Sequence, residues 1–155
     1  MKTITPFITD LKAGNVTKRR AAATALGKSG DKTAILVLSG ALGDPHPAVR
    51  CEVVQALGRL SDSSAVPGLI RALDDSEPAV RAAALAALGR IRDPQSAVAV
   101  TRLLQDREMV VRIGAAVVLG RLGDRRAIEP LKQLMNDPFT DVREAAGAAL
   151  IRLGK

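Results

Sequence analysis

Arginine recurs along this chain at a fixed interval of 31 residues, and these side chains are the first candidates for chemistry. The recurring residues are Arg19, Arg50, Arg81, Arg112 and Arg143. Five guanidinium groups in register could bind a row of phosphates, because each presents a fixed fork of donors. They could equally bind carboxylates, because an aspartate stands six residues before each of the last four arginines. Those aspartates are Asp44, Asp75, Asp106 and Asp137.

A second basic column follows the first, nine residues later in each repeat. It consists of Lys28, Arg59, Arg90, Arg121 and Arg152. We expect these residues near the C-terminal ends of helices, where a cation complements the helix dipole. Because no acidic residue interrupts the column, it could also steer an acidic ligand.

The composition excludes most enzyme chemistry. Histidine and cysteine occur once each, at His46 and Cys51, which is too few for a His/Cys metal site or a Cys-His nucleophile pair. The Leu-Gly dipeptides fall where helices should end, so they do not form a phosphate-binding loop. We therefore expect no catalytic residue, no metal and no cofactor.

Other columns with the same interval describe the elements that carry these side chains. The repeated apolar and small positions are Leu26, Leu57, Leu88, Leu119 and Leu150, with Gly27, Gly58, Gly89 and Gly120. The third unit predicts a helix over 64–73, a turn over 74–77 and a second helix over 78–91. In that second helix, Val80, Ala84, Leu88 and their neighbours form one apolar stripe. A helix pair of this size cannot bury such a stripe alone, so adjacent units must stack.

The pattern Asp-x-x-x-x-Val-Arg-x-x-Ala-Ala-x-Ala-Leu-Gly-x-Leu-x-Asp resembles the HEAT-like repeat of the type named after phycobilisome lyases. The resemblance covers residues 1–155 as a single domain with units 1–31, 32–62, 63–93, 94–124 and 125–155. It implies an all-α fold, a right-handed α-solenoid of five two-helix repeats, with the second helix of each unit on the concave face. It also implies that the Asp–Arg pairs tie adjacent turns together. The first unit departs most, since Lys18 replaces the Val and Ala13 replaces the Asp of the pattern.

The exposed side of the second helices is the predicted partner-binding surface. Its residues are Cys51, Gln55, Ala82, Ala86, Met109, Ile113 and Val117. In the fourth unit Met109, Ile113 and Val117 are spaced i, i+4 and i+8, outside the stripe that should be buried. An apolar floor beside the basic column would suit an amphipathic helix with acidic flanks.

Glu52 departs from its column, which otherwise holds Ala or Gly. A carboxylate at a close helix contact must reach solvent or find a basic partner. Arg19 and Arg81 are the predicted partners.

These features favour a non-catalytic scaffold or adaptor that binds another protein. The alternative implied by the resemblance is a bilin lyase or a subunit of one. The third possibility is an electrostatic nucleic-acid binder, suggested by the net charge of +7 but disfavoured by only two aromatic residues. We expect a cytoplasmic protein with no membrane span. Because the end units lack polar caps, we also expect them either to fray or to self-associate with another copy.

Overall fold

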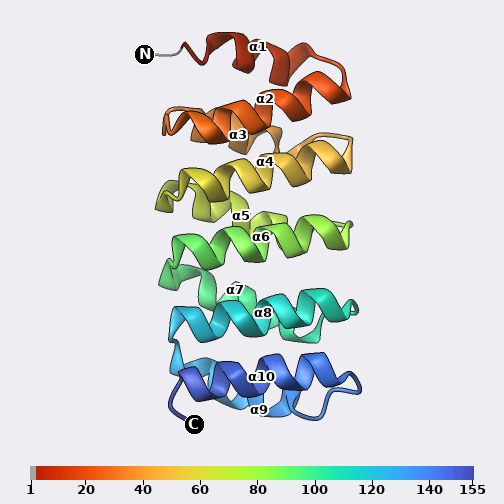
Figure 1. Cartoon of the computed structure of the whole chain (residues 1–155), viewed down its shortest axis with the longest axis vertical. Coiled ribbons are helices and arrows are strands. Elements are labelled where there is room, and N and C mark those ends of the chain that lie inside the picture. Colours follow the sequence, from red (N-terminus) through yellow and green to blue (C-terminus); the bar gives the residue numbers. More distant parts are fainter. Residues whose placement is uncertain (1–2) are drawn as a thin grey trace.

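The computed structural model describes residues 3–155 as an all-α solenoid, as predicted. Helices come in pairs that stack along one axis, and the two ends of the chain lie at opposite ends of the stack (Figure 1). The first helices of the pairs are α1 (Thr5–Ala13), α3 (Ala34–Gly40), α5 (Val66–Ala72), α7 (Ala97–Arg102) and α9 (Ile128–Leu134). The second helices are α2 (Val16–Ser29), α4 (Pro47–Leu60), α6 (Pro78–Ile91), α8 (Met109–Leu122) and α10 (Thr140–Arg152).

The first helices are shorter than the sequence predicted. The expected helix over 64–73 is divided into a 3₁₀ turn, η2 (Ser63–Ala65), and α5. Similar turns border α3, α7 and α9: η1 (Ala41–Gly43), η3 (Pro94–Ser96), η4 (Leu103–Gln105) and η5 (Arg125–Ala127). The aspartate before η2, η3 and η5 accepts a backbone N–H two residues later, which favours a tight turn over a full α-helical start.

The second helices form one layer, with α3, α5, α7 and α9 behind them and α1 at the end of the stack beside α2 (Figure 1). Helix α6 has the predicted bounds, 78–91. Proline opens α4 and α6, where its missing N–H is not needed for an intrahelical bond. A residue with positive φ ends α2, α4, α6 and α8, and reverses the chain toward the next pair.

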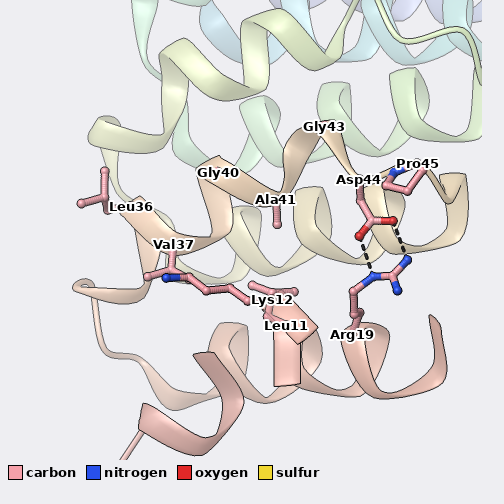
Figure 2. A pocket seen from close by; sticks show the side chains of 10 residues that line it. All are labelled: Leu11, Lys12, Arg19, Leu36, Val37, Gly40, Ala41, Gly43, Asp44 and Pro45. Carbon is pink, nitrogen blue, oxygen red and sulfur yellow. Dashed lines mark hydrogen bonds and ion pairs between the residues drawn. The ribbon is translucent and has the colours of Figure 1, made fainter. Parts of the chain in front are cut away.

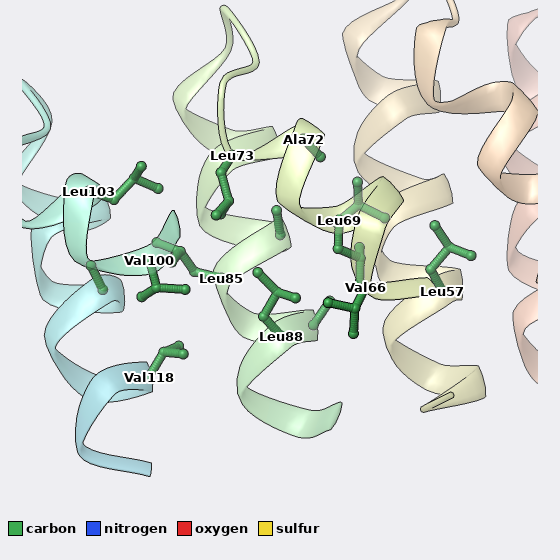
Figure 3. Close-up of a cluster of buried hydrophobic side chains, with 14 of the residues drawn as sticks. Leu57, Val66, Leu69, Ala72, Leu73, Leu85, Leu88, Val100, Leu103 and Val118 are labelled. Carbon is green, nitrogen blue, oxygen red and sulfur yellow. The ribbon is translucent and has the colours of Figure 1, made fainter. Parts of the chain in front are cut away.

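The core lies between the two layers and continues from one pair to the next (Figure 3). Leu69 of α5 packs in the same cluster as Leu88 of α6, and both are fully buried. The predicted stripe of α6 is confirmed at Val80, Ala84 and Leu88. Leu85 was missed, although it is only 1% exposed. The buried arc of α6 is therefore wider than one stripe, because α6 touches its own first helix, α5, and the two neighbouring second helices, α4 and α8.

A column of glycines lets the second helices approach one another closely. A Cβ atom placed on Gly27 would lie 2.7 Å from the Cα of Ala56, and one on Gly58 would lie 2.8 Å from the Cβ of Ala87. Both distances are too short for a side chain, so these glycines are required by packing. They lie inside the last turn of their helices, near the helix ends where the sequence placed them.

Among residues 3–155, no helix is both long enough and apolar enough to cross a membrane. The first predicted unit, 1–31, also includes Met1 and Lys2, which lie outside the described residues.

Candidate partner-binding face

The first arginine column is built into the contacts between pairs. The side chain of Arg81 lies in α6, where Nε and NH2 donate to the two carboxylate oxygens of Asp106 at 2.8 and 2.9 Å. Its NH1 donates to the backbone carbonyl of Asp75 at 2.8 Å. One guanidinium group thus joins the turn of its own unit to the turn of the next. We call this arrangement a clamp. The four clamps join Arg19 to Asp44, Arg50 to Asp75, Arg81 to Asp106 and Arg112 to Asp137.

The predicted partner within each clamp was wrong. The sequence suggested the aspartate six residues before each arginine, but the bound carboxylate lies 25 residues after it. The earlier aspartate contributes only its backbone carbonyl, because its own carboxylate faces the preceding unit. Arg143 has no carboxylate bond within the described residues, and its NH1 donates to the carbonyls of Asp137 and Pro138.

The clamps hold their carboxylates in the charged form. Burial raises the pKa of Asp75 and Asp106, but hydrogen bonds from the arginine and from a backbone N–H two residues on outweigh it. The pKa of each is therefore below its usual value. The pKa of Asp137 is also lowered, chiefly by the hydrogen bond from Arg112. These groups serve as fixed anions and are poorly suited to act as general acids near neutral pH.

The basic column differs from the clamps, although it lies on the same helices. Lys28, Arg90, Arg121 and Arg152 are exposed, and none forms an ion pair with any residue from 3 to 155. Arg59 is the exception, since its NH1 lies 3.3 Å from a carboxylate oxygen of Glu52.

Glu52 has a basic partner, as expected, but this partner is Arg59 and not Arg19 or Arg81. Its carboxylate accepts a hydrogen bond from the hydroxyl of Thr24 at 2.7 Å and contacts Arg59, whereas Arg19 and Arg81 are occupied by the clamps. The carboxylate lies between α2 and α4, so it faces the preceding pair near the middle of the helix. The clamps bind at the helix starts, which is why Glu52 does not meet them.

Exposed apolar side chains gather on α8. Met109 and Val117 are each 38% exposed, and Val110 is 54% exposed. The sequence analysis overlooked Val110 because it followed only the spacing i, i+4 and i+8. We call Met109, Val110 and Val117 the α8 patch. We call the exposed side of all the second helices the second-helix face. It includes the α8 patch and the basic column.

Ile113 is less exposed than predicted. It is half-buried and packs against the core, as does Cys51 at the equivalent position of α4. The reason is visible at Cys51, whose Sγ lies 4.0 Å from the carbonyl oxygen of Ala79 at the start of α6. This column therefore faces the junction with the next second helix. Ala82 is half-buried in the same column, whereas Gln55, Ala86 and Val117 are exposed.

Four of the predicted residues meet in one cleft between α4 and α6. Gln55 and Ala86 line it together with Arg59 and Arg90. The other predicted surface residues lie outside this cleft. Two guanidinium groups beside an alanine-rich floor can bind an anion, but the cleft lining contains no nucleophile or general base.

A larger cavity of about 730 Å³ lies on the other side of the stack, where α1 meets α3. Figure 2 shows the clamp between Arg19 and Asp44 in its wall. Aliphatic groups make up most of the remaining lining, and Leu36 nearby is 82% exposed. We assign no chemistry to this cavity, since its one carboxylate is already paired.

Within the part of the chain that the structure describes, no group of His, Cys, Asp and Glu side chains is arranged to hold a metal ion. His46 is exposed, as predicted, and its Nδ1 accepts a hydrogen bond from the backbone N–H of Ala48 at 3.2 Å. The imidazole therefore caps the start of α4.

The stacked helix pairs and repeated clamps define a solenoid repeat protein. The family model of HEAT repeats matches residues 4–77 and 66–151, and the chain belongs to this family. No curated protein matches the sequence.

Two solved structures illustrate the similarity. A chain in the complex of CpcE and CpcF of phycocyanin lyase from Nostoc sp. PCC7120 is 27% identical, with a TM-score of 0.85 over 99% of the present chain. The present chain spans 65% of that chain's length. A designed armadillo repeat protein in complex with the peptide (KR)4 is 18% identical, with a TM-score of 0.74, and the match covers 97% of this chain and 81% of that one.

Proposed function

We propose that this protein is a non-catalytic scaffold or adaptor whose second-helix face binds a segment of another protein. One observation carries the proposal: the exposed α8 patch lies on the same layer of helices as a basic column that is mostly free of ion pairs. Neighbouring apolar groups on a solvated face commonly mark a contact surface. The family resemblance implies that this layer lies on the concave side, which supports the proposal.

An acidic amphipathic helix is the partner that this surface suits. Its apolar side would cover Val117 and Ala86, while its carboxylates would face Arg90 and Arg121. Solenoid proteins of known structure include one complex with a second subunit and one with a peptide, which supports a protein partner. The cytoplasmic location and the self-association through the end units stay predictions.

The test compares Val117→Asp with Val98→Asp as baits for capturing proteins from a lysate of the source cells. Val98 is the matched control, because it is a 66% exposed valine in the first helix of the same unit. We expect Val117→Asp to lose partners that wild type and Val98→Asp both capture, since a charge in an apolar contact is costly. Equal capture by all three baits would show that the α8 patch is ordinary surface. Helical circular dichroism must be unchanged for the comparison to hold.

A bilin lyase subunit is the second candidate, favoured by the similarity to a chain of the phycocyanin lyase complex. A change in visible absorbance on mixing the protein with a free bilin would support this function. An unchanged spectrum at concentrations that saturate a known lyase would count against it.

Electrostatic nucleic-acid binding is the third candidate. It predicts a duplex-DNA affinity that falls steeply with salt concentration. The exposed acidic residues Asp141 and Glu144 of α10 oppose such binding at one end of the face.

A further inference from the structure

The cleft between α4 and α6 has a volume of about 220 Å³ and opens onto the second-helix face. Its floor consists of small residues, Gly58, Ala83 and Ala87. Arg59 stands on one side and Arg90 on the other. The only ionisable groups in the lining are therefore two cations.

This junction differs from the two that follow it along the stack. At the α6–α8 junction, NH1 of Arg121 lies 3.5 Å from the position that a Cβ on Gly89 would take. At the α8–α10 junction, Cδ of Arg152 lies 3.4 Å from the same position on Gly120. The arginine of the following helix thus lies over the glycine at both junctions. At Gly58 the three nearest atoms all belong to Ala87, so Arg90 does not lie over this glycine as Arg121 and Arg152 do at the other two junctions.

Glu52 explains the position of Arg59. The NH1 group of Arg59 lies 3.3 Å from Glu52, and its NH2 group donates to the side-chain oxygen of Gln55 at 3.4 Å. These contacts hold Arg59 back toward its own helix. Arg90 forms no ion pair with any described residue, so the cleft retains an uncompensated positive charge.

We propose that the cleft binds one glutamate or aspartate side chain of an acidic amphipathic helix on the second-helix face, with Arg90 as its main contact. The proposal rests on the proposed function and names the partner's anchoring group. Charge complementarity supports it, because an arginine fork matches a carboxylate and the apolar floor excludes water around the pair.

The spacing of the column supports a helical partner. Packed helices lie about 8–10 Å apart, and residues seven apart on an α-helix are separated by about 10.5 Å along one face. A helix with one acidic residue in each heptad would therefore present successive carboxylates to Arg90, Arg121 and Arg152. Duplex DNA presents one charge about every 1.7 Å and would leave most phosphates unmatched by this sparse column.

The test uses two fluorescein-labelled amphipathic helical peptides that are identical except for glutamate or glutamine at one position of three successive heptads. Affinity is measured by fluorescence anisotropy for wild type, Arg90→Ala and Arg71→Ala. Arg71 is the matched control, because it is an exposed arginine of α5, the first helix of the same pair. We expect Arg90→Ala to weaken binding of the glutamate peptide about tenfold. Arg71→Ala should have little effect on the affinity for the glutamate peptide, and Arg90→Ala should have little effect on the affinity for the glutamine peptide.

Three results would overturn the proposal. These are no binding of the glutamate peptide, equal affinity of wild type for both peptides, and equal losses from Arg90→Ala and Arg71→Ala. The last result would mean that overall charge alone controls binding. Failure of the proposed function is distinguishable, because it appears as equal capture by the Val117→Asp and Val98→Asp baits, whatever the peptides do.

Discussion

Arg81 and Arg90 lie nine residues apart on α6, and both belong to columns that repeat along the whole chain. The side chain of Arg81 is 8% exposed and bound at two points to Asp106. Arg90 is exposed, with no ion pair to any described residue. The difference comes from what surrounds each end of the helix: the next pair supplies the carboxylate of Asp106 at the start, whereas Arg90 at the end lies beside the small residues of the cleft between α4 and α6. A regular interval therefore identifies a column but does not reveal its role.

The two columns also differ in what a substitution should change. A clamp arginine ties two units together and excludes water, so its loss should lower the free energy of unfolding. A basic-column residue contacts solvent, so its loss should leave stability unchanged and affect only the binding of partners. The following predictions test this contrast.

Acidification should produce the largest loss of stability, because it acts on all four clamps together. The clamp aspartates have lowered pKa values in the folded state, whereas an unfolded aspartate titrates near about 3.9. Their contribution to the free energy of unfolding is therefore complete above the unfolded pKa, and it is lost as the pH falls through the folded pKa values. We expect the urea midpoint to be similar at pH 7 and pH 5 and much lower at pH 3. A midpoint at pH 3 equal to that at pH 7 would contradict the assigned role of the clamps.

Removing one carboxylate should have the next largest effect. Asp106→Ala leaves Arg81 without its partner in a nearly buried site and should lower the free energy of unfolding by about 3 kcal/mol. Arg90→Ala should change it by less than about 0.5 kcal/mol. Urea unfolding followed by circular dichroism measures both. Similar losses from the two variants would remove the distinction between the columns.

An exposed ion pair of the same length should matter least. The Nζ of Lys32 lies 2.8 Å from Asp62, the same distance as between Arg81 Nε and Asp106, but the lysine side chain is 68% exposed. We expect Lys32→Ala to change the free energy of unfolding by less than about 0.5 kcal/mol, because solvent screens the pair. If the same urea experiment gives a loss comparable to that of Asp106→Ala, burial is not what separates strong pairs from weak ones here.

Much of the fold followed from the sequence because its determinants are local. The apolar spacing in 78–91, with Pro78 at the start, was sufficient to predict the bounds of α6. The 3₁₀ turn at Ser63–Ala65 was missed because competition between the aspartate cap and the α-helical bonds depends on small energy differences. For the candidate surface, sequence spacing identified Met109 and Val117 but not Val110, and it overestimated the exposure of Ile113.

The repeat, the pairing of helices within each unit and the two basic columns can be identified from the amino-acid sequence. Which carboxylate each arginine binds depends on the stacking of the pairs, because stacking and not the local chain path closes the 25-residue separation between Arg81 and Asp106. The contacts of Glu52 with Thr24 and Arg59, and the cleft between α4 and α6, also follow from the stacking. These features depend on how two second helices approach each other, a distance set by the summed packing of many side chains.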